Sequence, residues 1–408
     1  MQFVYNIGIG VYNLLIFFFS FFSKKADLWI AGRKDWATKL KVLKNQKVIW
    51  IHAASLGEFE QGRPIIDRLF LEDNGCKVLL TFFSPSGYEI RKDYENADLV
   101  MYLPIDSIKN SKQFLSMLDL EMVVFVKYEF WFNFLNQLKV NKVKTVFVSV
   151  IFRENQMFFK WWGKWFLNHL KGVSQFFVQN SQSKSILASY DITSVQVAGD
   201  TRFDAVYETQ KLSKTNKLIE AFIGNKKCIV FGSTWDKDHD LIIQFLNNYK
   251  NKDVKFIIAP HEINPVEINR LKALINLRVV NYLDNESSAD VMIINTIGIL
   301  KHLYQYAIGS YIGGGFGAGI HNTLEVAVQN QFVIFGPKFQ KFQEAKDLIN
   351  NGIAASVSNQ LEFFNALDKL IKEKDFRGEV AEKSKIYIES NIGASDKVMN
   401  YINKYLNK

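Results

Sequence analysis

The sequence predicts an α/β fold in which two doubly wound domains face a cleft, preceded by an N-terminal membrane anchor helix. Three observations support this. Continuously apolar runs alternate with helical patterns from residue 47 onward, a polar, lysine-rich segment interrupts them over 206–226, and residues 1–23 carry no charged side chain. With 408 residues, 48% of them hydrophobic, the chain is long enough for two domains with buried cores.

Residues 1–23 are expected to form the membrane anchor. Their apolar stretch LLIFFFSFF ends just before Lys24 and Lys25. A secretory signal peptide has positive charges before its apolar stretch and small residues at a cleavage site, and neither pattern is present. Roughly 20 apolar residues would just span a bilayer, with the rest of the chain in the cytoplasm. Because Asn6 and Asn13 weaken the span, an interfacial helix and a buried core helix remain as alternatives.

Residues 24–205 form the first predicted domain. Its strands are expected in runs that are apolar throughout, as in a parallel sheet covered on both faces. The runs are KVIWIHA, KVLLTFF, LVMYLP, MVVFVK, KTVFVSV, QFFVQN and VQVAG.

Residues 206–226 are expected to be a linker, and residues 227–408 a second domain of the same kind. The alternation restarts there with KCIVFGS, KFIIAPH, RVVNYL, DVMIIN, GSYIGG and QFVIFGP. Open α/β sheets bind ligands at the carboxyl ends of their strands, so we expect the cleft there. A last helix near 378–406 could pack back on the first domain.

The formal charge of +9 favours an anionic partner, either a phospholipid surface or a phosphorylated substrate. Nucleic acid is not expected, because the aromatic and basic residues form no stacking platform. Residues 158–172, with Trp161, Trp162 and Trp165 among lysines, suit either a membrane interface or a helix packed on the sheet. The six histidines lack metal-binding spacing and no CxxC occurs, so we expect no metal or cofactor.

The stretch HAASLGEF supplies the candidate catalytic residue. Glu58 follows a predicted strand through Ser55 and Gly57, so it lies where a helix begins. A helix N-terminus favours an ionised carboxylate, Gly57 leaves room for a substrate, and Ser55 could touch it. Glu58 could therefore remove a proton from an incoming hydroxyl, or it could merely cap its helix.

A glycine loop follows a later strand, in YIGGGFGAGIHNTLEV. The backbone N–H groups of such a loop, beside a helix start, can bind phosphate. The alternative is a tight turn that needs glycine for its own packing. The predicted nucleotide-binding residues of this loop are Gly313, Gly314, Gly315, His321, Asn322 and Glu325. A nicotinamide cofactor is not expected, because the next strand end lacks the acidic residue for its ribose.

Other strand ends supply further candidates. Ser233 and Thr234 could bind phosphate or cap a helix, and Pro260 and His261 face the same cleft. In the first domain, Glu129 and the cation Arg153 are candidate substrate contacts.

Taken in order, several segments closely resemble the 3-deoxy-D-manno-octulosonic acid (Kdo) transferases of lipopolysaccharide assembly. These segments are IWIHAASLGEFEQGRPIIDRL, YEFWFN, GDTRFDAV, FGSTWDKDH, APHEINP, NTIGILKHLYQYA and IGGGFGAGIHNTLEVAVQNQFVIFGP. The resemblance implies a GT-B glycosyltransferase with two Rossmann-like domains at the inner membrane, which transfers Kdo from CMP-Kdo to a lipid A precursor with inversion. It also implies that Glu58 is the catalytic base.

The chain departs from the family pattern at the expected donor side. Ala259 and Pro260 stand where the family has an arginine motif, and Asn295 and Ile299 replace two carboxylates. Two alternatives therefore stay open: a GT-B enzyme that uses a UDP-sugar, such as another transferase or an epimerase, and an inactive, membrane-attached protein that binds a sugar nucleotide.

Overall fold

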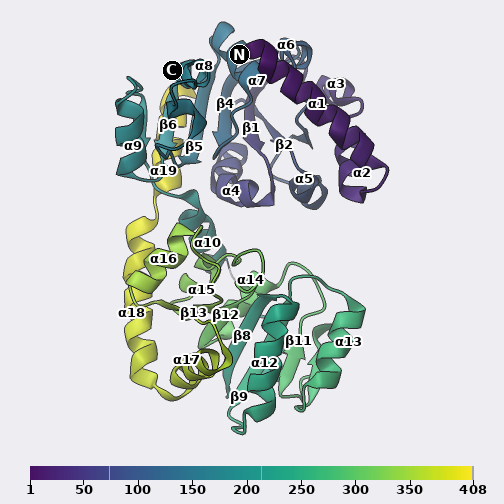
Figure 1. Ribbon diagram of the computed structural model, residues 1–408, viewed down its shortest axis with the longest axis vertical. Coiled ribbons are helices and arrows are strands. Elements are labelled where there is room, and N and C mark those ends of the chain that lie inside the picture. The colour runs from purple at the N-terminus through teal and green to yellow at the C-terminus, as the bar shows by residue number, and fades with distance from the viewer. Residues whose placement is uncertain (73, 213, 407–408) are drawn as a thin grey trace. The chain divides into compact units, whose positions relative to one another are not determined.

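The computed structural model describes residues 1–72, 74–212 and 214–406, which form two compact α/β units (Figure 1). The first unit comprises residues 1–205 and the chain from Ile392 onward, and the second comprises Val206–Asn391. Each unit contains one seven-stranded, entirely parallel sheet. The predicted pair of doubly wound sheets is therefore confirmed.

The first sheet has the strand order β3-β2-β1-β4-β5-β6-β7. Its strands are β1 (Lys47–Ala53), β2 (Lys77–Phe82), β3 (Leu99–Tyr102), β4 (Asp119–Val126), β5 (Lys144–Val150), β6 (Gln175–Val178) and β7 (Val195–Val197). Its helices are α1 (Gln2–Ser20), α2 (Lys24–Ala31), α3 (Trp36–Lys39), α4 (Leu56–Leu71), α5 (Pro85–Arg91), α6 (Ile108–Ser116), α7 (Phe132–Val140), α8 (Lys164–Leu170), α9 (Ser181–Ala188) and α19 (Ala394–Leu406), with 3-10 turns η1 (Leu40–Leu43) and η2 (Met157–Phe159).

The second sheet has the order β10-β11-β9-β8-β12-β13-β14. Its strands are β8 (Lys227–Thr234), β9 (Val254–Pro260), β10 (Val279–Asn281), β11 (Val291–Ile293), β12 (Gly309–Ile312), β13 (Phe332–Phe335) and β14 (Ala354–Ser356). Its helices are α11 (Lys217–Ile223), α12 (Asp236–Asn248), α13 (Pro265–Leu274), α14 (Leu300–Leu303), α15 (Leu324–Ala327), α16 (Gln343–Asn350), α17 (Gln360–Lys372) and α18 (Lys374–Asn391), with η3 (Tyr282–Asp284) and η4 (Tyr304–Tyr306).

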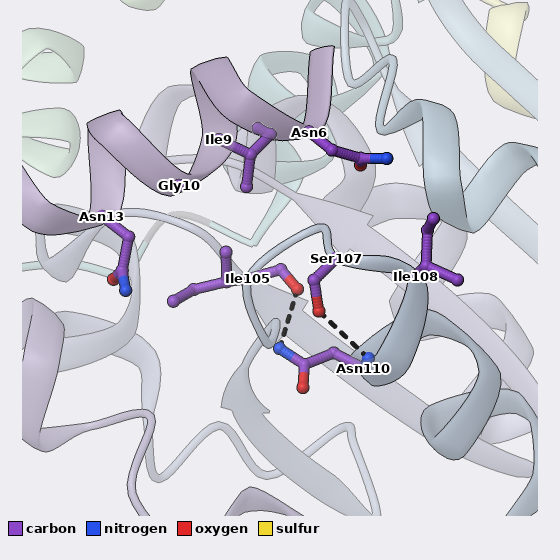
Figure 2. A pocket seen from close by; sticks show the side chains of 8 residues that line it. All are labelled: Asn6, Ile9, Gly10, Asn13, Ile105, Ser107, Ile108 and Asn110. Atoms are coloured by element: carbon purple, nitrogen blue, oxygen red, sulfur yellow. Dashed lines mark hydrogen bonds between the residues drawn. The ribbon is translucent and has the colours of Figure 1, made fainter. Parts of the chain in front are cut away.

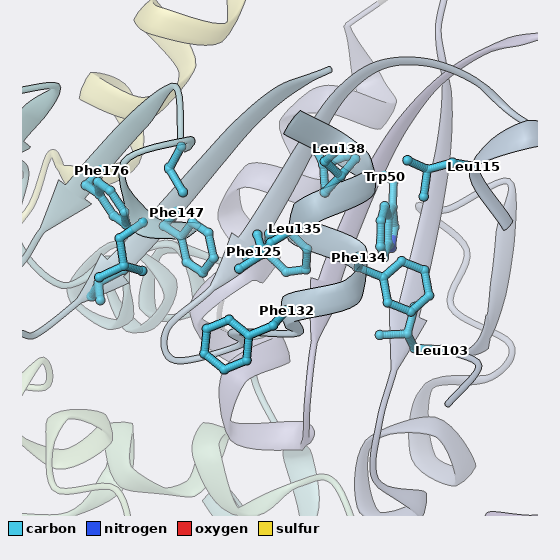
Figure 3. Close-up of a cluster of buried hydrophobic side chains, with 14 of the residues drawn as sticks. Trp50, Leu103, Leu115, Phe125, Phe132, Phe134, Leu135, Leu138, Phe147 and Phe176 are labelled. Atoms are coloured by element: carbon cyan, nitrogen blue, oxygen red, sulfur yellow. The ribbon is translucent and has the colours of Figure 1, made fainter. Parts of the chain in front are cut away.

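The strands of the first unit are apolar throughout because both faces of the sheet are buried. Along β1, Trp50 enters one core cluster while Ile49 and Ile51 enter another on the opposite face. Figure 3 shows the first cluster, in which Phe134 of α7 and Phe125 of β4 lie near Trp50, with ring centroids 5.5 and 5.4 Å from its own. This double burial holds the carboxyl ends of β1 and β4 in place.

The segment expected as a linker is largely helical in the structure. Helix α10 (Thr201–Lys211) runs from the first unit into the second, and α11 follows within residues 217–223. The C-terminal segment, expected as one helix over 378–406, is divided into α18 and α19 near Gly393, whose φ is 93°. Helix α19 lies against the first sheet, where Val398 and Ile402 join the cluster around Ile49.

Helix α1 is the N-terminal apolar helix that the sequence predicts. It is long and apolar enough to cross a membrane, and none of its residues is buried. One side nevertheless contacts the first unit: the Tyr5 hydroxyl donates to Asp106 Oδ2 at 2.5 Å, and Asn6 Oδ1 accepts from Asn133 Nδ2 at 2.9 Å. The alternative of a buried core helix is therefore wrong.

Candidate active site

The predicted residues of the first unit lie where its strand order reverses. Strands β1 and β4 are neighbours, and the sheet extends from them in opposite directions. Such a switch point leaves a crevice at the carboxyl ends of the two strands. Glu58 follows β1 in the first turn of α4, and Lys127 and Glu129 follow β4.

The Glu58 carboxylate is held by side chains. The Ser55 hydroxyl donates to Glu58 Oε2, and Lys127 Nζ lies 3.7 Å from Oε1. Ser55 is the N-cap residue of α4, yet among the described residues its side chain makes no capping bond to the backbone. The Glu58 side chain is 20% exposed, so it is both positioned and accessible.

The pairing of Lys127 with Glu58 is a feature that the sequence interpretation missed. Lys127 directly follows β4 and has a left-handed backbone, with φ of 65°, while its N–H donates to the Val148 carbonyl at 2.9 Å. The one available signal was its position at the end of the apolar run MVVFVK, next to the strand that precedes Glu58.

Glu129 belongs to a network within the protein. The Trp131 indole N–H lies 2.9 Å from Glu129 Oε2 and 3.0 Å from His52 Nε2. The buried His52 ring contacts Thr81 Oγ1 through Nδ1 at 2.8 Å. Glu129 Oε2 is therefore already bonded to the protein, and the Glu129 side chain is only 13% exposed.

The structure gives Arg153 and Gly57 no contact with the Glu58 carboxylate among the contacts described. Exposed Arg153 contacts Tyr128, whose pKa is raised by burial and lowered in part by that guanidinium. A Cβ atom added at Gly57 would meet Ser55 Oγ at 3.8 Å, an ordinary contact distance, so packing does not require glycine there.

In the second unit, the predicted residues also gather where the strand order reverses, between β8 and β12. Ser233 has a left-handed backbone, with φ of 52°. Buried Thr234 uses its hydroxyl to contact His239 Nε2 at 3.0 Å, and Pro260 is its partner on β9. The Thr234 hydroxyl is thus bonded within the protein.

The glycine loop has fewer backbone N–H groups available to a phosphate than the sequence predicts. The N–H of Gly313 donates to Gly232 O at 2.9 Å, that of Gly314 to Asp238 Oδ2 at 2.9 Å, and that of Gly317 to Gly314 O at 2.8 Å. These N–H groups cannot also hold a phosphate. A Cβ atom at Gly313 would lie 2.3 Å from Ser233 O, and one at Gly315 would lie 2.6 Å from Gly336 Cα, so backbone packing explains both glycines.

Three aromatic rings stack beside this loop. The His261 ring centroid lies 4.5 Å from that of Trp235 and 4.3 Å from that of His321. The Trp235 indole N–H donates to His321 Nε2 at 2.9 Å. Trp235 was not predicted, although it directly follows Ser233 and Thr234 in the sequence.

Burial and the neighbouring His261 lower the pKa of His321 to about 4. Burial also lowers the pKa of His261. His321 is therefore neutral at pH 7. Because its Nε2 accepts from Trp235, we assign its proton to Nδ1, which leaves one N–H donor available.

Asn322 and Glu325 lie beside the stack, at the start of α15. Asn322 Oδ1 accepts from the Leu324 N–H and its Nδ2 donates to Glu325 Oε1, both at 3.2 Å. The second unit therefore brings His261 against His321, which Asn322 directly follows, while the nucleotide-binding role of these residues stays a prediction.

Comparison with known proteins identifies the relatives of this chain. The profile of the family described as 3-deoxy-D-manno-octulosonic-acid transferase (kdotransferase) matches residues 33–205. A 3-deoxy-D-manno-octulosonic acid transferase from Rickettsia typhi is 26% identical over 378 residues, which cover 88% of this chain and 79% of the relative. The chain is a relative of the Kdo transferases.

Two further similarities add to this relationship. A bifunctional glycosyltransferase/methyltransferase from Fusobacterium nucleatum is 26% identical over 355 residues, which cover 83% of this chain and only 55% of that protein. The UDP-GlcNAc 2-epimerase structure from Neisseria meningitidis covers 88% of this chain and 100% of its own, with a TM-score of 0.63 and 17% identity. The Kdo transferase relationship supports a glycosyltransferase, and the epimerase likeness shows a GT-B-like fold alone.

Proposed function

We propose that this chain is an inverting glycosyltransferase that moves Kdo from CMP-Kdo to a lipid A precursor. The single observation that carries the mechanism is the Glu58 carboxylate in the first turn of α4, held by Ser55 and Lys127 and still partly exposed. The relationship of the chain to the Kdo transferases supports Kdo as the transferred sugar.

Glu58 acts as the general base in this proposal. It takes the proton of the acceptor hydroxyl as that oxygen bonds to the anomeric carbon of Kdo. The bond from that carbon to the CMP phosphate oxygen breaks, and its electron pair leaves with CMP. Ser55 and Lys127 keep the carboxylate in one position, which is what proton transfer in the transition state requires.

The donor phosphate would be bound by the second unit. His321 offers its Nδ1–H, and Asn322 and His261 lie beside it. These are neutral donors that can stabilise the phosphate as negative charge develops on the leaving CMP. We assign this role to the side chains rather than to the glycine loop, whose Gly313 and Gly314 N–H groups are already bonded.

The acceptor would be reached at an inner-membrane surface, with both units in the cytoplasm. Helix α1 is followed by Lys24 and Lys25, as the positive-inside rule requires of that orientation. Trp161 is 93% exposed, and Trp165 of the same segment contacts Tyr5 of α1 at a centroid distance of 5.8 Å. The tryptophan-rich segment therefore adjoins α1, which supports a common membrane-facing side of the first unit.

Glu58→Gln tests the proposal. We expect this variant to transfer Kdo at least about 100-fold more slowly, because proton removal is lost, while its affinity for CMP-Kdo stays within about twofold. Mass spectrometry of the lipid product and calorimetry of donor binding measure the two quantities.

Glu60→Gln is the matched control, because Glu60 lies on the same helix and pairs with Arg63 and Arg91 instead. It should keep near-normal transfer. Normal turnover by Glu58→Gln would reject the proposed base. Turnover of a UDP-sugar, with none of CMP-Kdo, would reject the proposed donor.

A further inference from the structure

A pocket of about 420 Å³ lies between α1 on one side and the end of α2 with the residues that follow it on the other. Asn13, Leu14 and Phe17 line it from the helix, and Trp29, Arg33 and Lys34 line it from the other side. Neither Glu58 nor the stacked rings of the second unit line it, so the pocket is separate from the candidate active site.

Arg33 is a buried cation without a carboxylate partner among the described residues. Its side chain donates to the carbonyl oxygens of Leu103, Trp29 and Phe83 at 2.9, 2.9 and 2.7 Å. Only 8% of the residue is exposed, and its guanidinium lies 3.7 Å from the centroid of the Trp29 ring. A buried charge is costly unless an opposite charge compensates it, and carbonyl oxygens supply only partial charges.

Trp29 provides a second, independent observation. Its indole N–H is buried and has no hydrogen-bond partner in the part of the chain that the structure describes. Buried donors are nearly always satisfied, so this unpaired N–H, on a residue that lines the pocket, is consistent with an acceptor that the described part of the chain does not supply. Lys34 is exposed beside it, with no ion pair to any described residue.

The residues that line the pocket carry an indole N–H, a guanidinium, an ammonium and the Asn13 amide, and none of them is acidic. Oxygen atoms of an anion fit such a set, and a phosphate accepts several hydrogen bonds at once. Burial lowers the pKa of Arg33 to about 9, and the group is still a cation at pH 7.

The surroundings of the pocket are apolar. A neighbouring pocket of about 410 Å³ shares Gly10, Asn13 and Ile105 with it, and Figure 2 shows Ile9 and Ile105 on its opposite sides. Leu14 and Phe17 of α1 are 54% and 47% exposed at the mouth. A ligand with a phosphate and apolar chains would match both the cationic lining of the pocket and the apolar side chains at its mouth.

We propose that this pocket binds the phosphate of an anionic membrane phospholipid, whose acyl chains lie along the exposed apolar side of α1. The site would tie the helix to the first unit through a lipid. This binding requires no sugar transfer, so it stands or falls independently of the proposed enzyme activity.

The test uses the full chain and monomeric dihexanoyl phosphatidylglycerol, with binding measured by calorimetry. Trp29→Phe keeps the ring over Arg33 but removes the unpaired N–H, and Lys34→Glu reverses the exposed charge. We expect each variant to weaken binding about tenfold, because each removes a bond to a charged acceptor. These variants leave in place the three carbonyl bonds of Arg33, whose loss could prevent folding.

Lys184→Glu is the control that makes the same change in charge, since Lys184 is exposed on α9 of the same unit. It should bind the lipid like the parent protein. Equal binding by the Lys34 and Lys184 variants, or unchanged binding by Trp29→Phe, would overturn the proposal. So would equally tight binding of inorganic phosphate, because the site would then not be specific for a lipid.

Discussion

At the scale of single residues, the neutral state of His321 makes the stability of the second unit sensitive to acid. In the unfolded chain a histidine titrates near pH 6.5, whereas burial and His261 lower the pKa of folded His321 to about 4. Between these values the unfolded state binds more protons than the folded state. The contribution of neutral His321 to the free energy of unfolding is therefore fully present above pH 6.5, and it is lost as the pH falls toward 4.

His321→Phe should reduce this dependence on pH. Phenylalanine keeps an aromatic ring in the stack with His261, and the 38% exposed Trp235 can then donate its N–H to water. We expect the urea midpoint of the parent protein to fall more steeply than that of the variant between pH 6.5 and pH 4.5. Parallel curves would show that His321 does not titrate as its burial implies.

For single residues, the sequence indicated which side chains are candidates for the site, but not which other side chains they contact. Glu58 could be placed after a strand, but two roles remained because acidic residues are also common in the first turn of a helix, where they act as caps. The partner Lys127 has no local signal, because it meets Glu58 only through the pairing of β1 with β4 in the sheet. Trp235, His261 and His321 come from three separate segments, so their stacking has no local signal.

At the scale of elements, the capping of α19 secures the C-terminal helix to the first unit. Asp204 Oδ1 accepts from the Gly393 N–H at 2.6 Å, and Oδ2 accepts from the Ser395 N–H at 2.7 Å. Asp204 and Ser395 are both buried. An aspartate from α10, almost 200 positions earlier, thus replaces a local cap for this helix.

Asp204→Ala should destabilise the first unit by about 2 kcal/mol, because it leaves one buried and one part-buried N–H group without acceptors. Urea unfolding followed by tryptophan fluorescence measures the loss. Asp396→Ala serves as control: Asp396 lies on the same helix, but its side chain is 65% exposed in its pair with Arg68. That change should cost less than about 1 kcal/mol. Equal costs would mean that Asp204 is not the cap that holds α19.

Strands were easier to predict than helices and connections. A run such as KVIWIHA is apolar at every position because both faces of its sheet are covered, and that signal is contained in the run itself. Residues 206–226 read as a linker because they are polar, yet α10 and α11 occupy most of them. Helix α11 buries Ile219 and Phe222 in the second unit. The polar residues around these two side chains hide that apolar face in the sequence.

At the scale of the whole molecule, the proposed binding to a membrane could come from net charge or from apolar side chains. The formal charge is +9, but each lysine near an anionic surface contributes only about 1 kcal/mol, and salt screens it. Helix α1 exposes Phe3, Val4, Leu15, Phe18 and Phe19 by 50–76%. Burying such a side chain contributes about 1–2 kcal/mol that salt does not screen.

Leu15→Asp should therefore reduce cosedimentation with phospholipid vesicles at least about tenfold, whereas raising the salt from 0.1 to 1 M should have a smaller effect. Leu361→Asp is the matched control, because Leu361 is 70% exposed on α17 of the second unit. It should leave vesicle binding unchanged. If both leucine variants bind alike and salt alone releases the protein, the positive charge rather than α1 holds it at the membrane.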